Sequence, residues 1–358
     1  MNSYILNLFR LSEKINDKWF SITYCVAVTA VLISCKKDTD TKKISSSYRP
    51  TPDTIIYPNN FPIMFLPITN SQTKEGVELG RHLYYDSNLS LNGSQQGFSC
   101  SSCHSQAASF SSSGGVLQVL PHVNLAWNNF FLWDGSKTGT LEDMMKFEVE
   151  EFFESDLIGI RSNPKYNNLY KKAFGTVDIT LERTEYALAQ FFRSLTSCNS
   201  KFDQYVAHKA KLSTSEWNGF LIFTTEKGDC FHCHSIPLTT DNVFHNIGLD
   251  SLFDEANSGR YNYTKNPVDI GLYKTPTLRN IELTAPYMHD GRFETLEEVV
   301  EHYNSGVKYS STLDPIMTKP AKEFGLQLTL QEKADLVAFL KTLTDSSFIS
   351  NPKLSNPN

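Results

Sequence analysis

The sequence lacks an excess of basic residues. Its 358 residues include 33 Lys and Arg against 39 Asp and Glu, so the formal net charge is −6. A protein that binds nucleic acid through a basic face is therefore not expected. Short-period repeats are absent too, and 40% hydrophobic with 20% charged residues excludes global disorder. The length suits about two domains of ordinary size.

Long apolar runs are scarce, and the one that stands out covers residues 19–34. It is uncharged and too short to span a bilayer comfortably, as in the apolar part of a signal peptide. It ends at Cys35, before a polar stretch, and so resembles a bacterial lipoprotein signal, in which that cysteine carries lipid. A simple N-terminal anchor is the alternative. We expect a signal at 1–34, a flexible linker at 35–55, and a periplasmic, membrane-anchored lipoprotein.

Cysteines are few, and four of the seven form two close pairs, which indicates cofactor attachment rather than a disulfide framework. Both pairs belong to C-x-x-C-H motifs, Cys100-Ser101-Ser102-Cys103-His104 and Cys230-Phe231-His232-Cys233-His234. Two thiols one helical turn apart can add to the vinyl groups of haem, and the histidine then binds the iron. A zinc site would need two further ligands at finger-like spacing, which the first motif lacks. Two copies in an exported chain predict two covalently bound c-type haems.

Apolar periodicity predicts a mainly α protein with two cytochrome c-like haem domains and long connecting loops. The expected helices cover residues 74–86, 141–153 and 181–205, and two more open at the capping boxes of 213–216 and 329–332.

A domain boundary is expected near residues 207–213. It separates an N-terminal haem domain at 56–210 from a C-terminal haem domain at 211–345. The tail at 346–358 is expected to be loose.

Longer stretches in both halves carry a resemblance. They are Leu79–Asp86, Asn124–Asn128 and Phe131–Gly135 in the first half, and Phe244–Leu249, Tyr273–Asn280 and Thr284–Gly291 in the second. In this order they resemble the bacterial di-haem cytochrome c peroxidase family, which includes the methylamine-dehydrogenase maturation enzymes. The resemblance covers about residues 62–345.

The resemblance implies a division of labour between the haems. The haem of His104 would react with peroxide, and the haem of His234 would store or relay an electron. Trp133 matches the tryptophan that lies between the two haems and carries charge. On its sequence context alone, Trp133 is a buried aromatic residue in a Phe-rich segment.

Peroxide cleavage needs a group that takes a proton from one oxygen and gives it to the other. The resemblance places a glutamate above the open haem about twenty residues after the tryptophan, and its register favours Glu154. Glu148, Glu150 and Glu151 crowd the same window, and such a cluster is otherwise typical of a solvated face. Met144 replaces a glutamine that is frequent in the family.

The resemblance also implies an outer ligand for the second haem. The family's peroxidases have a methionine at the position of Tyr303, whereas the maturation enzymes have a tyrosine there. A phenolate is an anionic donor that stabilises ferric iron. Met288, Met317 and His302 are rival ligands, and an ordinary tyrosine at a helix end is the alternative.

A calcium ion usually lies between the family's haems. The matching positions here are the carbonyls of Thr284 and Pro286 and the side chain of Gln118, where the family has an asparagine. An amide oxygen is still a hard ligand.

The loop after Phe110 lacks the histidine that blocks the peroxide face in some members, so we expect an open, five-coordinate first haem. His122 is the nearest rival for that position. We interpret His82, His208 and His245 as structural, and Cys198 as a free buried thiol.

The leading hypothesis is a di-haem peroxidase that reduces hydrogen peroxide to water with electrons from a small periplasmic redox protein. A maturation-type enzyme that oxidises a partner protein with peroxide is the second hypothesis, and Tyr303 favours it. The third is a non-catalytic di-haem electron carrier, which would have two low-spin haems. Dimers are frequent in the family, so a homodimer is also considered.

Overall fold

The computed structural model describes residues 48–112, 118–320, 322, 323 and 325–358. The expected signal and the lipid attachment at Cys35 lie outside these residues. Within the described residues, no helix combines the length and apolarity needed to cross a membrane.

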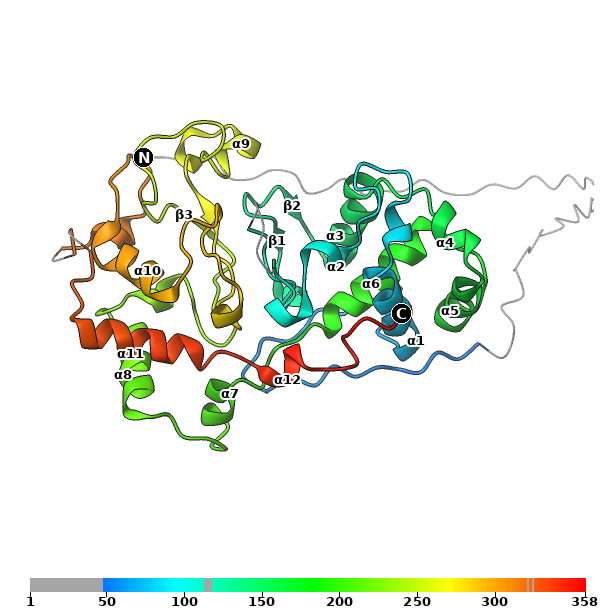
Figure 1. The fold of residues 1–358 in the computed structure, drawn as a ribbon, viewed down its shortest axis with the longest axis horizontal. Coiled ribbons are helices and arrows are strands. Elements are labelled where there is room, and N and C mark those ends of the chain that lie inside the picture. Colours follow the sequence, from blue (N-terminus) through cyan, green and yellow to red (C-terminus); the bar gives the residue numbers. More distant parts are fainter. Residues whose placement is uncertain (1–47, 113–117, 321, 324) are drawn as a thin grey trace, which may run out of the picture. The chain divides into compact units, whose positions relative to one another are not determined.

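Helices dominate, joined by long loops and short 3-10 turns (Figure 1). They are α1 (Lys74–Tyr84), α2 (Cys100–Cys103), α3 (Leu141–Phe147), α4 (Ile158–Ser162), α5 (Pro164–Phe174), α6 (Leu181–Ser194), α7 (Lys201–Val206), α8 (Thr214–Phe223), α9 (Tyr261–Thr264), α10 (Leu296–Glu301), α11 (Leu330–Lys341) and α12 (Ser346–Ile349). π-helical turns at Glu148–Phe152 and His302–Gly306 extend α3 and α10. The mainly α prediction is confirmed.

Each half is built on an early helix packed against a late one. Helix α1 packs on α6, and α8 packs on α11 (Figure 1). Both crossings occur at a glycine. A Cβ on Gly80 would lie 2.0 Å from the Ala187 carbonyl oxygen, and one on Gly219 would lie 1.9 Å from that of Asp335. Only glycine allows the backbones to approach so closely. This helix pair is the frame that a cytochrome c domain needs around its haem.

Two apolar cores follow this division. The first contains Leu79, Leu83 and Phe191, and the second contains Phe223, Phe339 and other residues of α8 and α11.

The expected helix at 181–205 is interrupted, which corrects the sequence prediction. Helix α6 ends at Ser194, and α7 begins again with its own capping box, in which Ser200 and Asp203 bond each other's backbone N–H groups. Between them, the Asn124 side chain accepts from Ser197 N at 2.9 Å and donates to Ser197 O at 3.0 Å. Phe202 already belongs to the second core, so the change of core comes before the expected boundary at 207–213.

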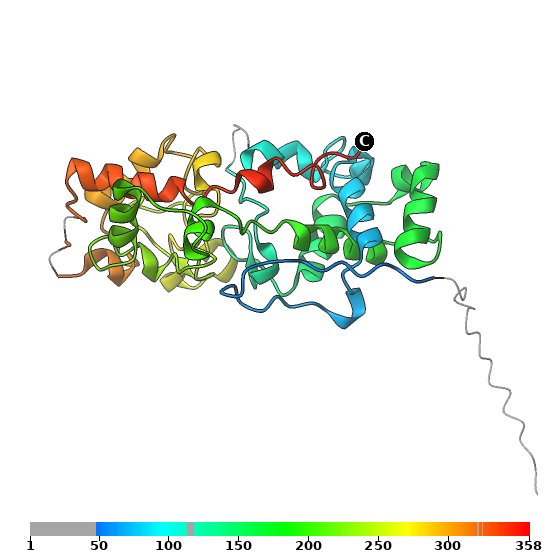
Figure 2. The same ribbon diagram turned by 90° about the horizontal axis from the view of Figure 1, so that it is seen from below.

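The tail at 346–358 is not loose, and that expectation was wrong. Asp345 caps α12, and Phe348 and Leu354 are only 3% and 5% exposed. Both belong to the first core, and Tyr85 donates its hydroxyl hydrogen to Leu354 O at 2.7 Å. After the second domain, the chain therefore returns to complete the first, as the C-terminal segment shows in Figures 1 and 2.

The C-terminal part of the expected flexible linker is also bound. The backbone N–H of Thr51 donates to Glu75 at 2.8 Å, and that of Asp53 donates to Gln72 O at 3.1 Å. Residues 51–53 are thus held along the start of α1.

Two short antiparallel strand pairs carry residues of interest, and the first of them is a hairpin. Strand β1 (Phe130–Phe131) pairs antiparallel with β2 (Lys137–Thr138), and β3 (Phe244–His245) pairs antiparallel with β4 (Tyr273–Lys274). The first hairpin presents Trp133 in its loop.

Candidate haem sites

The histidine of the first motif is oriented as an iron ligand. His104 ends the turn of α2, and its Nδ1 lies 2.8 Å from Phe110 O. A carbonyl oxygen only accepts, so Nδ1 must carry the hydrogen and Nε2 is left with a free lone pair. Burial lowers the pKa of His104 to about 4, which keeps the ring neutral. A neutral imidazole held through its other nitrogen is the form that ligates a metal.

The second motif repeats this arrangement. The Nδ1 of His234 lies 3.0 Å from Thr239 O, and burial lowers the pKa of His234 below its usual value. The same acceptor type holds both rings, so both Nε2 atoms are available. The described cysteines form no disulfide, so the four motif thiols remain free for attachment.

A cavity beside the second motif fits a haem. Its wall includes Cys230, Cys233 and His234 together with apolar side chains of α8, α10 and α11, namely Phe223, Leu296, Val299, Val300, Leu336 and Leu340. Attachment thiols, an oriented imidazole and an apolar wall are what a covalently bound porphyrin requires.

Tyr303 lines this cavity, in the π-helical turn that follows α10. Burial raises the pKa of Tyr303 well above its usual value, so the phenol is protonated when no metal ion binds its oxygen. Met288 and Met317 line the same cavity and remain rivals. His302 does not face the cavity: its Nε2 lies 3.0 Å from Ile247 O.

Trp133 lies in the wall of the second cavity although it belongs to the first half of the chain. Its indole N–H donates to Gln118 O at 3.0 Å, and its carbonyl accepts from the Lys274 N–H at 2.8 Å. The residue is therefore held from both halves. This placement suits the predicted relay, whose role stays a prediction.

His122 does not lie where a second ligand opposite His104 would be. Its ring stacks on that of His104, with centroids 3.5 Å apart and planes inclined by 16°, and Tyr84 bonds its Nδ1 at 3.1 Å. Two imidazoles on opposite sides of one iron point at each other end to end. These two lie face to face, so His122 is on the same side as His104. The stacking of His122 on His104 therefore favours the expectation that the peroxide face of the first haem is open.

The four glutamates of the acidic cluster differ in environment. Glu154 is exposed, with a left-handed backbone at φ 46°, and Glu151 pairs with Lys137 at 2.8 Å. Glu148 is half-buried, and burial raises its pKa to about 7. The Glu148 charge also helps to raise the pKa of the Cys100 thiol, after burial, so Glu148 lies near the first haem attachment. In the sequence, Glu148 is one of the candidates in this window, but register favours Glu154. The position of Glu148 one turn after the buried Met144 and Met145 was the signal that could have singled it out.

The residues predicted for calcium come together but do not fit the ion as placed. The Gln118 amide nitrogen donates to Thr284 O at 3.0 Å, and the amide oxygen accepts from the Ser112 hydroxyl at 2.9 Å. Calcium needs oxygen ligands, whereas a nitrogen donor faces the carbonyl here.

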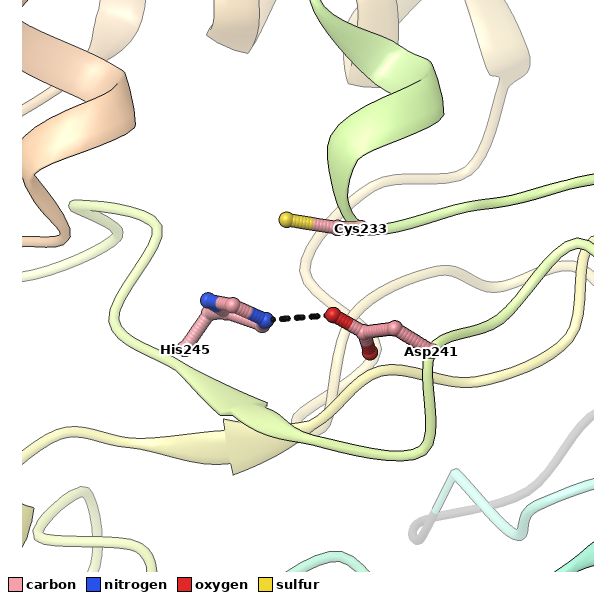
Figure 3. A group of neighbouring side chains, drawn as sticks. All are labelled: Cys233, Asp241 and His245. Atoms are coloured by element: carbon pink, nitrogen blue, oxygen red, sulfur yellow. Dashed lines mark hydrogen bonds and ion pairs between the residues drawn. The ribbon is translucent and has the colours of Figure 1, made fainter.

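Among the histidines interpreted as structural, His245 has the most distinct setting. Asp241 and Asp314 bind its two ring nitrogens at 2.9 and 2.5 Å. Although burial acts in the opposite direction, these carboxylates raise the pKa of His245 to about 12. Cys233, Asp241 and His245 lie close enough to suggest a metal site (Figure 3). The Cys233 thiol is the second haem's attachment point, and the imidazolium has no free lone pair, so no ion fits there.

The other side chains that we interpreted as structural, two histidines and a cysteine, have ordinary surroundings. His82 bonds Asn358 through Nδ1 at 3.0 Å, His208 is exposed, and Cys198 is free but only half-buried.

Known proteins are similar to this chain over most of its length. Residues 74–211 match the family model described as di-haem cytochrome c peroxidase. Methylamine utilization protein MauG of Methylophilus methylotrophus is 34% identical over 77% of this chain and 84% of its own length. Cytochrome-c peroxidase IdrP1 of Pseudomonas sp. (strain SCT) is 31% identical over 78% and 84%. The chain belongs to the di-haem cytochrome c peroxidase family.

A solved structure supports the same assignment for the fold. A MauG-like protein associated with microbial copper homeostasis superposes with a TM-score of 0.76 and 31% identity, covering 84% of this chain and 98% of its own. Membership of the di-haem peroxidase family implies two c-type haems, and the two C-x-x-C-H motifs supply their attachment.

One residue of the second site was missed by sequence reasoning. Lys274 is 3% exposed and lies in the wall of the cavity that holds Cys233 and His234. A lysine inside the stretch Tyr273–Asn280 was quoted only as part of the family resemblance, because periodicity in a two-residue strand does not show which side chains are buried.

Proposed function

We propose that this di-haem peroxidase reduces hydrogen peroxide to water in the periplasm, with electrons from a small redox protein such as a cytochrome c. The observation that carries the proposal is the pair of motif histidines, His104 and His234, each fixed through Nδ1 with Nε2 free. The proposal assigns an open face to the first haem iron, and Tyr303 lines the cavity beside the second motif.

The reaction consumes one peroxide, two electrons and two protons and yields two waters. The haems supply the electron chemistry when bound. His104 and His234 would hold the two irons, Trp133 would supply an indole beside the second haem, and an acidic side chain would handle protons. Glu154 is the proposed acid–base group, and the half-buried Glu148 is its rival. Calcium is left out of the proposal, because the Gln118 nitrogen faces Thr284.

The test uses the holoprotein. Mass spectrometry should find two haems per chain, and EPR of the oxidised protein should show one high-spin and one low-spin iron. Steady-state turnover of peroxide with reduced cytochrome c should then be measurable. Two low-spin irons that bind neither cyanide nor peroxide would instead identify a non-catalytic electron carrier.

A second candidate function is peroxide-driven oxidation of a partner protein, and Tyr303 is the observation that favours it. It predicts weak turnover with reduced cytochrome c and persistence of the peroxide-oxidised state until a protein substrate is added. Strong turnover with cytochrome c would reject it.

Lipid attachment at Cys35 is also part of the proposal. Wild-type protein expressed in a bacterial host with its own signal should fractionate with membranes, and Cys35→Ala should release it to the soluble periplasmic fraction. Membrane retention of Cys35→Ala would favour an uncleaved N-terminal anchor. Wild-type protein and Cys35→Ala can also be assayed for self-association, because we consider that the protein forms a homodimer.

A further inference from the structure

Lys274 is a buried cation with a poor partner. Its side chain lies in the wall of the second haem cavity and is 3% exposed. Its Nζ donates to Thr275 O at 3.3 Å, and no carboxylate of the described residues forms an ion pair with it. A buried ammonium is costly unless an anion compensates it. Burial accordingly lowers the pKa of Lys274 to about 8, against the opposing charge of Asp241.

The other basic side chains around this cavity are paired with carboxylates or neutral. His245 lies between the carboxylates of Asp241 and Asp314. Figure 3 shows its contact with Asp241. Lys322 pairs with Asp229. His289 stacks on Tyr273 at 3.7 Å, and burial lowers its pKa, so it is neutral at pH 7.

A porphyrin of the c type brings two propionate carboxylates into its cavity. We propose that Lys274 binds a propionate of the second haem and so acts as a positioning residue for that haem. This inference rests on the proposed function, in that it requires a haem at Cys230 and Cys233. It assigns to Lys274 a partner that the protein itself does not supply.

The same residue lies beside the proposed electron path. The Lys274 main-chain N–H donates to the Trp133 carbonyl at 2.8 Å. The same residue therefore holds the Trp133 segment through its backbone and the propionate through its side chain. A fixed positive charge near an iron favours the reduced state, which carries one positive charge fewer. Lys274 therefore raises the reduction potential of the second haem.

The experiment compares Lys274→Met, Lys274→Arg and the exposed control Lys341→Met as holoproteins. Spectroelectrochemical titration should show a lower potential for the second haem in Lys274→Met, by at least a tenfold change in the reduction equilibrium, or about 59 mV. Lys274→Arg and Lys341→Met should stay near the wild-type value. The resonance Raman band of propionate bending should shift in Lys274→Met only.

An unchanged potential and Raman band in Lys274→Met would overturn the inference, as would equal shifts in the Arg and Met variants. If Lys274→Met does not incorporate haem, Lys274→Gln is titrated in its place and judged by the same outcomes. Wild-type protein with one haem would instead contradict the proposed function. Two haems without a potential shift would contradict only the role of Lys274.

Discussion

The main-chain N–H of Lys274 donates to the carbonyl oxygen of Trp133 at 2.8 Å. This bond joins β4 of the second domain to the hairpin loop of the first. The indole also donates to Gln118 O, so Trp133 is fixed at two points in the wall of the second haem cavity. A relay residue needs such a fixed position, because electron transfer rates depend steeply on separation.

Replacing the proximal histidine of the first haem should abolish turnover. His104→Ala removes the Nε2 that binds iron, so we expect complete loss of peroxide reduction and loss of the native high-spin EPR signal. The control is His208→Asn, because His208 is exposed with φ 58° and asparagine tolerates that backbone. Full activity in His104→Ala would show that peroxide reacts elsewhere.

The acid–base assignment can be tested by comparing glutamates. Glu154→Gln should lower kcat by roughly 100-fold or more while leaving haem content unchanged, since proton transfer by a positioned side chain contributes about that much. Glu151→Gln serves as the control because Glu151 is exposed and paired with Lys137. Retained activity in Glu154→Gln combined with loss in Glu148→Gln would move the role to Glu148.

Glu148 should also affect stability in a pH-dependent way. Burial raises its folded pKa from 4.5 to about 7, so the folded state binds the proton more tightly than the unfolded state between these values. Stability from this group is present at low pH and is lost as pH rises through 7. Glu148→Gln should therefore raise the free energy of unfolding by about 1–3 kcal/mol at pH 8 and change it little at pH 4.

Chemical denaturation at both pH values measures this difference, and Glu151→Gln is again the matched variant. Equal effects of Glu148→Gln at pH 4 and pH 8 would contradict the pKa of about 7.

The tail should stabilise the first domain. Phe348→Ala removes a side chain that is 3% exposed and packed against Phe110, so we expect a loss of about 3–5 kcal/mol. Denaturant unfolding followed at the first haem's absorption band measures it. Lys353→Ala, at an exposed position of the same tail, should have little effect. A loss near zero for Phe348→Ala would mean that the tail is loose after all.

The outer ligand of the second haem is tested by Tyr303→Phe. Removal of the Tyr303 hydroxyl should change the low-spin EPR signal of that haem. It should also raise the reduction potential of the haem, because the ferric iron loses an anionic donor. Tyr309→Phe is the control, at a side chain that is 77% exposed. An unchanged spectrum for Tyr303→Phe would point to Met288 or Met317 as the ligand.

Several features were predictable because they depend on residues close together in the chain. The spacing of Cys100, Cys103 and His104 specifies haem attachment within one helical turn. The capping boxes at Ser213 and Thr329 start α8 and α11 where expected. The expected helix over 181–205 was wrong because Asn124, more than seventy residues away, holds Ser197 in a connection that is not helical.

By itself the sequence determined the mainly helical class, the two haem-attachment sites and the family. These depend on covalent spacing and on local apolar patterns. Only the tertiary structure decided that His122 lies beside His104, that the last residues complete the first core, and that Lys274 is buried without a carboxylate partner. Burial and pairing are set by segments that are far apart in the chain, and no local pattern specifies which of them meet.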